Sequence, residues 1–158
     1  MLSSLPDHAR VWIYPSERPF TASEKSTVTK HATDFTQRWV AHSNQLKAAA
    51  EVLEDRFLVL AVDESQAGAS GCSIDSSVRF VQQLGAEMGV DFFNRMLFSY
   101  RTDTGEVITV GRPDFKAHYA SHEIKDDTIV FDPLIKTIGE LKEGFEKKLS
   151  DSWHRRMV

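Results

Sequence analysis

Cysteine is nearly absent from this chain of 158 residues, which contains only Cys72. A single cysteine cannot form an internal disulfide, and it cannot build a metal site that needs several thiolates. Unpaired cysteines are typical of reducing compartments, so we predict a cytoplasmic protein.

Long apolar runs and a surplus of positive charge are also missing. The longest apolar run, at 57–62, is far too short to cross a bilayer, so we expect no membrane insertion. The opening MLSSLPDHAR lacks a basic segment followed by an apolar stretch, which argues against a secretory signal peptide. The net charge of -4 gives no general attraction to nucleic acid, so we do not expect a nucleic-acid partner.

The composition that remains is that of a globular protein, with 41% hydrophobic and 27% charged residues. The length fits a single domain at 1–158 that can bury a core. Apolar residues recur with period two in strands and near 3.6 in helices. The expected elements are strands at 10–14, 48–53, 57–63, 96–101, 106–110 and 128–131, helices at 22–42, 74–88, from 113 and from 137 to about 149, and a tail at 150–158.

This order of elements predicts an α+β protein with an antiparallel or mixed sheet and with helices packed on one face. The first six elements follow the β-α-β-β-α-β order of the ferredoxin-like fold, and the later ones would be C-terminal additions. Residues 57–62 (FLVLAV) are apolar at every position. We therefore predict that they form a central strand covered on both faces.

The most distinctive stretch, VDESQAGASGCSIDSS at 62–77, lies between that strand and the second helix. Its acids, small residues and serines make 63–77 the candidate functional surface, because flexible polar loops on a rigid scaffold often carry function. The candidate ligand-binding residues are Asp63, Glu64, Ser65, Gly68, Gly71, Asp75 and Ser76.

Two kinds of chemistry could use this loop. Cys72, Ser70 or Ser73 would serve as the nucleophile of a hydrolase or transferase if a histidine lay within reach. Alternatively, the carboxylates of Asp63, Glu64 and Asp75 could hold Mg²⁺ or Ca²⁺, which prefer oxygen ligands, although their spacing matches no standard metal loop. No other cofactor is predicted.

The charge around the loop bears on which ligand it would accept. The start of a helix attracts anions, but with Ser73 as the N-cap, Asp75 would lie in the first turn and already use this effect. Asp63 and Glu64 add negative charge at the other end of the loop. We therefore expect the loop to be neutral or to prefer cations, and Cys72 not to be an activated thiolate.

The C-terminal segment SWHRR at 152–156 joins an aromatic residue to basic ones. Such a cluster could stack on a base and contact a phosphate. In an acidic protein we favour the alternative, in which Trp153 anchors the chain end and the arginines stay in water.

Three stretches resemble a family of small uncharacterised bacterial proteins whose members often carry the label ABC transporter ATPase. These stretches are LPDHARVWIY at 5–14, LAVDESQAGASGCSIDSS at 60–77, and SWHRR. The resemblance spans the chain and implies a bacterial source, but no particular activity. The chain lacks a Gly-x-x-x-x-Gly-Lys-Ser/Thr sequence, whose amides and lysine hold the phosphates of a nucleotide, so ATPase activity is not expected.

Two functional hypotheses remain. The first is a small binding or interaction module with 63–77 as its working surface, whose partner is a small molecule, a protein or a second copy of the chain. The second is an enzyme that uses the nucleophiles or the metal-binding acids named above. A histidine close to Cys72, Ser70 or Ser73 would favour the enzyme, whereas serines bonded only to backbone would favour the module.

Overall fold

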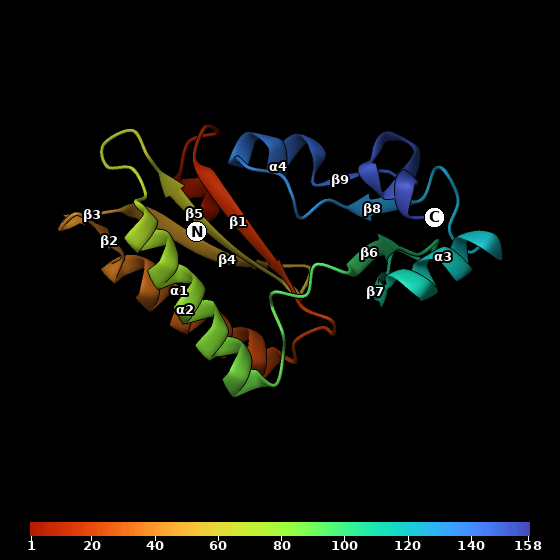
Figure 1. The fold of residues 1–158 in the computed structure, drawn as a ribbon, viewed down its shortest axis with the longest axis horizontal. Helices are drawn as coiled ribbons and strands as arrows, with labels where there is room; N and C mark the ends of the chain where they lie inside the picture. Colours follow the sequence, from red (N-terminus) through yellow and green to blue (C-terminus); the bar gives the residue numbers. More distant parts are fainter.

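The computed structural model describes all 158 residues and shows an α+β architecture (Figure 1). Four α-helices accompany three antiparallel sheets. The helices are α1 (Ala22–Arg38), α2 (Gly71–Met88), α3 (Arg112–Ala120) and α4 (Ile138–Gly144), with 3-10 helices η1 (Leu2–Ser4), η2 (Leu149–Asp151) and η3 (Trp153–Met157). The strands are β1 (Arg10–Pro15), β2 (Val40–Ala41), β3 (Asn44–Gln45), β4 (Lys47–Leu53), β5 (Phe57–Asp63), β6 (Leu97–Arg101), β7 (Val107–Gly111), β8 (Ile129–Phe131) and β9 (Glu146–Lys148).

Strand β5 is the centre of the first sheet, whose order is β1-β5-β4. Every residue of β5 is buried. Leu60 lies at its middle, opposite Trp12 of β1 and Ala50 of β4. The prediction of a central strand covered on both faces is confirmed, because an apolar side chain at every position is stable only when neither face meets water.

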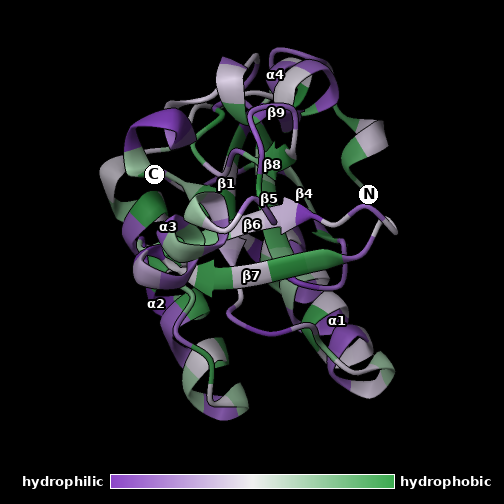
Figure 2. Ribbon diagram, turned by 90° about the vertical axis from the view of Figure 1, so that its right-hand side faces the viewer, coloured by the Kyte–Doolittle hydropathy of each residue, from purple (hydrophilic) through white to green (hydrophobic).

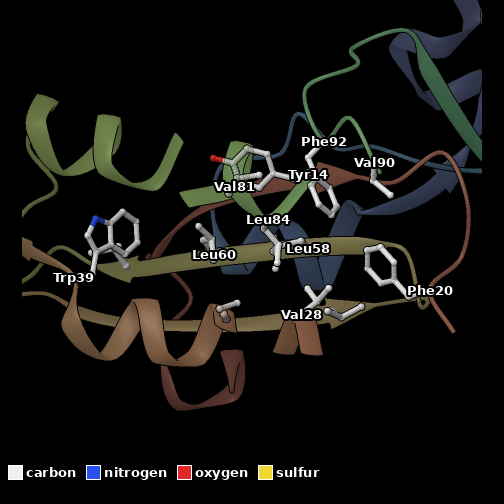
Figure 3. Close-up of a cluster of buried hydrophobic side chains, with 14 of the residues drawn as sticks. Tyr14, Phe20, Val28, Trp39, Leu58, Leu60, Val81, Leu84, Val90 and Phe92 are labelled. Carbon is white, nitrogen blue, oxygen red and sulfur yellow. The ribbon is translucent and has the colours of Figure 1, made fainter. Parts of the chain in front are cut away.

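Helices α1 and α2 cover one face of the first sheet, where their apolar stripes meet the side chains of β5 (Figure 3). The cluster includes Val28 from α1, Leu84 from α2 and Leu58 from β5. Local sequence sets the helix ends: Thr21 caps α1, and α2 stops at Gly89, whose φ of 67° is a left-handed conformation that glycine adopts without strain.

The opposite face of the first sheet is covered by segments from the two ends of the chain. Leu2 and Leu5 pack there with Ile138 of α4, against Val59 and Ala61 of the sheet. The backbone joins this contact, since the Ile138 amide donates to the Ala9 carbonyl at 3.0 Å. The two long helices therefore do share one face, while the short α4 lies on the other.

The second sheet has the order β7-β6-β8-β9, and α3 packs on it through Phe115. A ferredoxin-like arrangement would have required β6 to join the first sheet, and the structure does not show this. The outer edge of β1 is instead occupied by residues from late in the chain, because the Val11 amide donates to the Lys136 carbonyl at 2.9 Å. Strand β6 pairs with β7 and with β8.

A small aromatic cluster joins the two sheets. Phe57 of β5 packs with Phe131 of β8 and with Phe145, at ring-centroid distances of 5.4 and 5.0 Å. Beside it, the Arg56 guanidinium donates to the Thr109 hydroxyl at 3.1 Å. Burial lowers the pKa of Arg56 from its ordinary value, although no carboxylate forms an ion pair with it.

Two helices end earlier than the sequence predicted. Helix α1 ends at Arg38 instead of reaching residue 42, because Trp39 turns into extended backbone and the short β2–β3 pair follows. The helix expected from 137 to about 149 stops at Gly144, and strand β9 then pairs with β8. The first overestimate arose because the apolar spacing of α1 continues to Trp39. The second arose because the capping-box spacing of Thr137 and Glu140 marks the start of a helix and not its end.

The C-terminal residues pack on the second sheet. The Trp153 indole donates to Asp132 at 2.9 Å, while Arg155 and Arg156 are exposed. This agrees with the anchoring role expected for Trp153. None of the helices combines the length and the apolar character needed to cross a membrane.

Candidate functional site

The loop at 64–70 connects β5 to α2 and projects beyond the end of the first sheet (Figure 1). Glu64, Ser65, Gln66 and Gly68 are exposed, whereas Asp63 at its base is buried. The predicted site residues lie in this one segment of the chain, but Asp63 and Ser73 are buried, and the residues have different roles.

Asp63 fixes the start of the loop. One of its carboxylate oxygens accepts hydrogen bonds from the hydroxyl and the amide of Ser65, at 2.6 and 3.0 Å, and contacts His8 Nε2 at 3.3 Å. Lys47 Nζ lies 3.9 Å from the other oxygen. The bonds from Ser65 lower the pKa of Asp63, and His8 adds to this effect, so the carboxylate is ionised at neutral pH.

Glu64 fixes the far side of the loop. Its carboxylate accepts a hydrogen bond from the Ala69 amide at 3.0 Å, and Arg10 lies 3.9 Å away. A Cβ atom on Gly68 would come within 3.1 Å of the same carboxylate, so a side chain at 68 would require the end of the Glu64 side chain to shift slightly.

The serines at the start of α2 form a capping box. The Ser70 hydroxyl accepts from the Ser73 amide at 3.1 Å, and the Ser73 hydroxyl accepts from the Ser70 amide at 2.7 Å. The expected N-cap at Ser73 is wrong, because the helix begins at Gly71 and Ser70 caps it. As a result Asp75 lies beyond the first turn, which contains no acid.

The nucleophile candidates lack a catalytic base in this structure. Cys72 is exposed, and the hydroxyls of Ser70 and Ser73 bond only to backbone atoms. His8 is the one histidine that hydrogen bonds to the loop region. It contacts the same Asp63 oxygen that accepts a hydrogen bond from the Ser65 hydroxyl. A serine bonded to the carboxylate instead of the imidazole is not set up for nucleophilic attack.

The three acids proposed as metal ligands serve separate purposes. Asp63 and Glu64 hold the loop backbone, and Asp75 is an exposed residue of α2. No group of three or more His, Cys, Asp or Glu side chains in the structure could hold a metal ion. Gly71 opens α2 and Ser76 lies within it, half buried.

Sequence reasoning missed the residues that β1 contributes to this surface. Arg10 reaches Glu64 and also lies over the Trp12 ring, 4.7 Å from its centroid. Trp12 is half buried and contacts Trp39, whose indole donates to the Ser73 carbonyl at 2.8 Å. The alternation of His8, Arg10 and Trp12 was visible in the sequence, but only the pairing of Arg10 with Val62 places them beside the loop.

A separate hollow of about 410 Å³ lies at the other end of α2. It is mainly apolar, and Asp91 is its one charged residue. Because no set of polar groups converges there, the hollow indicates neither a particular ligand nor a reaction.

Comparisons with protein-family models, with curated proteins and with solved structures give no match to this chain.

Proposed function

We propose that this protein is a small binding module that presents the segment at 63–77, which comprises the end of β5, the loop at 64–70 and the start of α2, together with His8, Arg10 and Trp12, to a protein partner. The observation that carries the proposal is the set of hydrogen bonds that hold the backbone of this segment in place. Asp63, Glu64, Ser70 and Ser73 all bond to loop or helix backbone, so the polar side chains expected to do chemistry hold the loop in shape instead. A loop ordered in advance loses less entropy on binding.

The shape and composition of the surface favour a protein over a small molecule. Sites for small molecules are concave, whereas this loop projects from the sheet (Figure 1). Tryptophan and arginine are enriched among the residues that dominate protein interfaces, and here Arg10 stacks on Trp12 at the edge of the loop. The acids Glu64 and Asp75 and the cations Arg10 and Lys47 give the surface both signs of charge.

Selection of random peptides displayed on phage tests this proposal directly. We expect selected peptides to lose about tenfold or more in affinity for an Arg10→Ala variant, since a central arginine contributes more than about 1.4 kcal/mol at such interfaces. Lys116→Ala, an exposed change on α3, is the matched control and should leave affinity unchanged. Calorimetry measures both. Peptides that bind Arg10→Ala as tightly as the wild-type protein would contradict the proposed surface.

Nucleotide binding is a second, negative expectation. Without a phosphate loop containing lysine, the chain should show neither stoichiometric binding of MgATP in calorimetry nor release of phosphate. The start of α2 offers capped amides but no basic side chain in its first turn to add to them. A stoichiometric micromolar signal that disappears when 68–73 is mutated would contradict this expectation.

A further inference from the structure

Strand β7 is the one sheet edge longer than two residues that carries neither charge nor proline, since the uncharged strands β2 and β3 have only two residues each. Edge strands normally resist association through charge, proline or coverage. In the second sheet the opposite edge, β9, consists entirely of Glu146, Lys147 and Lys148. In the first sheet β1 ends at Pro15 and β4 begins at Lys47 and carries Glu51.

By contrast, β7 reads Val-Ile-Thr-Val-Gly, without charge or proline, and each of its residues is half buried. It pairs only with β6. Figure 2 shows it at the front of the molecule, largely hydrophobic in colour, and in Figure 1 it forms the lower side of the second sheet with no ribbon below it. An uncharged edge in which four of five residues are β-branched can act as a template for another strand.

The hydrogen bonding of the β6–β7 hairpin shows which backbone groups face the open edge. The Thr102 amide donates to the Glu106 carbonyl at 2.7 Å, so this pair is hydrogen bonded. Bonded and non-bonded pairs alternate along an antiparallel ladder. Ile108 and Val110 consequently bond to β6, and the amides and carbonyls of residues 107 and 109 point away from it. The Gly111 amide also points outward, whereas the Gly111 carbonyl, at the N-cap of α3, accepts the first hydrogen bond of that helix.

We propose that two copies of this protein associate through antiparallel pairing of their β7 strands, centred on Thr109. In this register Thr109 lies opposite Thr109 of the second copy, and Val107 lies opposite Gly111 in both directions. The two Thr109 residues then exchange two hydrogen bonds, and the Gly111 amide of each copy donates to the Val107 carbonyl of the other. A register shifted to either side leaves one of the three residues without a partner. Two 4-stranded sheets would join into a continuous sheet of eight strands.

Charge at the two ends of β7 supports the same register. Glu106 precedes the strand and Arg112 follows it. Pairing centred on Thr109 places Glu106 of each copy beside Arg112 of the other copy. Both residues are exposed, and neither forms an ion pair within the chain. A twofold interface uses one surface patch twice, so the same pair forms at both ends.

Gly111 offers a change that blocks this edge while leaving the chain fold intact. Its φ of -74° suits proline, and a Cβ atom there would meet nothing closer than 3.8 Å. Gly111→Pro removes an outward amide and puts a ring in its place, so we expect the dimer to be lost. Gly111→Ala keeps the amide and should dimerise like the wild-type protein. Thermal unfolding checks that both variants fold.

A charge exchange tests the register itself. Glu106→Arg and Arg112→Glu should each weaken the dimer by about 10-fold or more, because each places like charges together at both ends of the pairing. The double variant, which carries both changes, should recover the wild-type affinity. Analytical ultracentrifugation over a wide concentration range measures each dissociation constant.

Three results would overturn the proposal: a wild-type protein that is monomeric at all concentrations, a dimer that survives Gly111→Pro, or a double charge variant no tighter than the single ones. The interface lies on the second sheet and shares no residue with the loop at 63–77, so its failure leaves the proposed binding surface untouched.

Discussion

Replacing Leu60 with aspartate is expected to prevent folding. Leu60 is 0% exposed, and it lies at the middle of the central strand β5 between Trp12 and Ala50. The change removes a buried apolar side chain and puts an unpaired carboxylate in its place, at a combined cost of about 5 kcal/mol or more. A domain of ordinary stability has only about 5–15 kcal/mol to lose.

Circular dichroism and the amide dispersion of NMR spectra measure the outcome. Leu60→Ala should still fold, with stability lowered by about 2–5 kcal/mol from the cavity it leaves. Leu134→Asp is the matched control, because Leu134 is 63% exposed and the same change of side chain there should have little effect. A Leu60→Asp protein that is soluble and melts cooperatively would show that β5 is not the centre of the core.

The second large effect concerns the acid stability of the protein and depends on His154. This side chain is fully buried: Trp153 stacks on it at a centroid distance of 3.9 Å, and Phe98 and Phe115 lie close by. Its Nδ1 lies 2.6 Å from the Ser152 hydroxyl, while Nε2 has no hydrogen-bond partner.

Burial lowers the pKa of His154 from 6.5 to about 4; Asp132 opposes this shift and Lys147 adds to it. Burial by itself would raise the pKa of Asp132, but hydrogen bonds from Lys147 and Trp153 lower it. Asp132 and Lys147 therefore form an ion pair close enough to His154 to influence its pKa. The histidine therefore stays neutral in the folded protein at neutral pH.

The sign of the pH effect follows from proton uptake. Between pH 6.5 and about 4 the unfolded chain binds a proton at this histidine and the folded chain does not, so the free energy of unfolding falls as the pH falls. Between pH 7 and 5 the expected loss is about 2 kcal/mol. The stability gained on raising the pH is complete once the pH exceeds the unfolded value of 6.5.

Urea unfolding of the wild-type protein and of His154→Phe, at both pH values, measures this loss. Phenylalanine keeps the aromatic packing and does not titrate, so its loss between pH 7 and 5 should be smaller by about 2 kcal/mol. Equal losses in the two proteins would mean that His154 is protonated within the fold.

Local patterns in the sequence predicted the local structure well. The central strand at 57–63, the hairpin from 96–101 and 106–110, and the helix stop at Gly89 are all present. Each depends on residues adjacent in the chain: an unbroken apolar run, a Thr-Asp-Thr-Gly turn, and a glycine free to adopt positive φ.

The assembly of those elements was harder to predict. No residue near 97 indicates that this strand joins the second sheet instead of the first. Its absence from the first sheet depends on Lys136 and its neighbours, which occupy the edge of β1. The same limit applied to the candidate site. The loop at 63–77 was identified from its composition, but its contacts with His8, Arg10 and Lys47 depend on strand register, which distant residues determine.

The order of synthesis matters for this protein, because the first sheet is completed only late in the chain. The Val11 amide bonds to Lys136, and Ile138 covers one face of a sheet whose strands all lie before residue 64. When β5 and α2 have left the ribosome, Leu2 and Leu5 can already cover part of this sheet face, but the part under Ile138 is still exposed to solvent. Contacts between residues this far apart form slowly. Until α4 emerges, chaperones would have an apolar sheet face to bind.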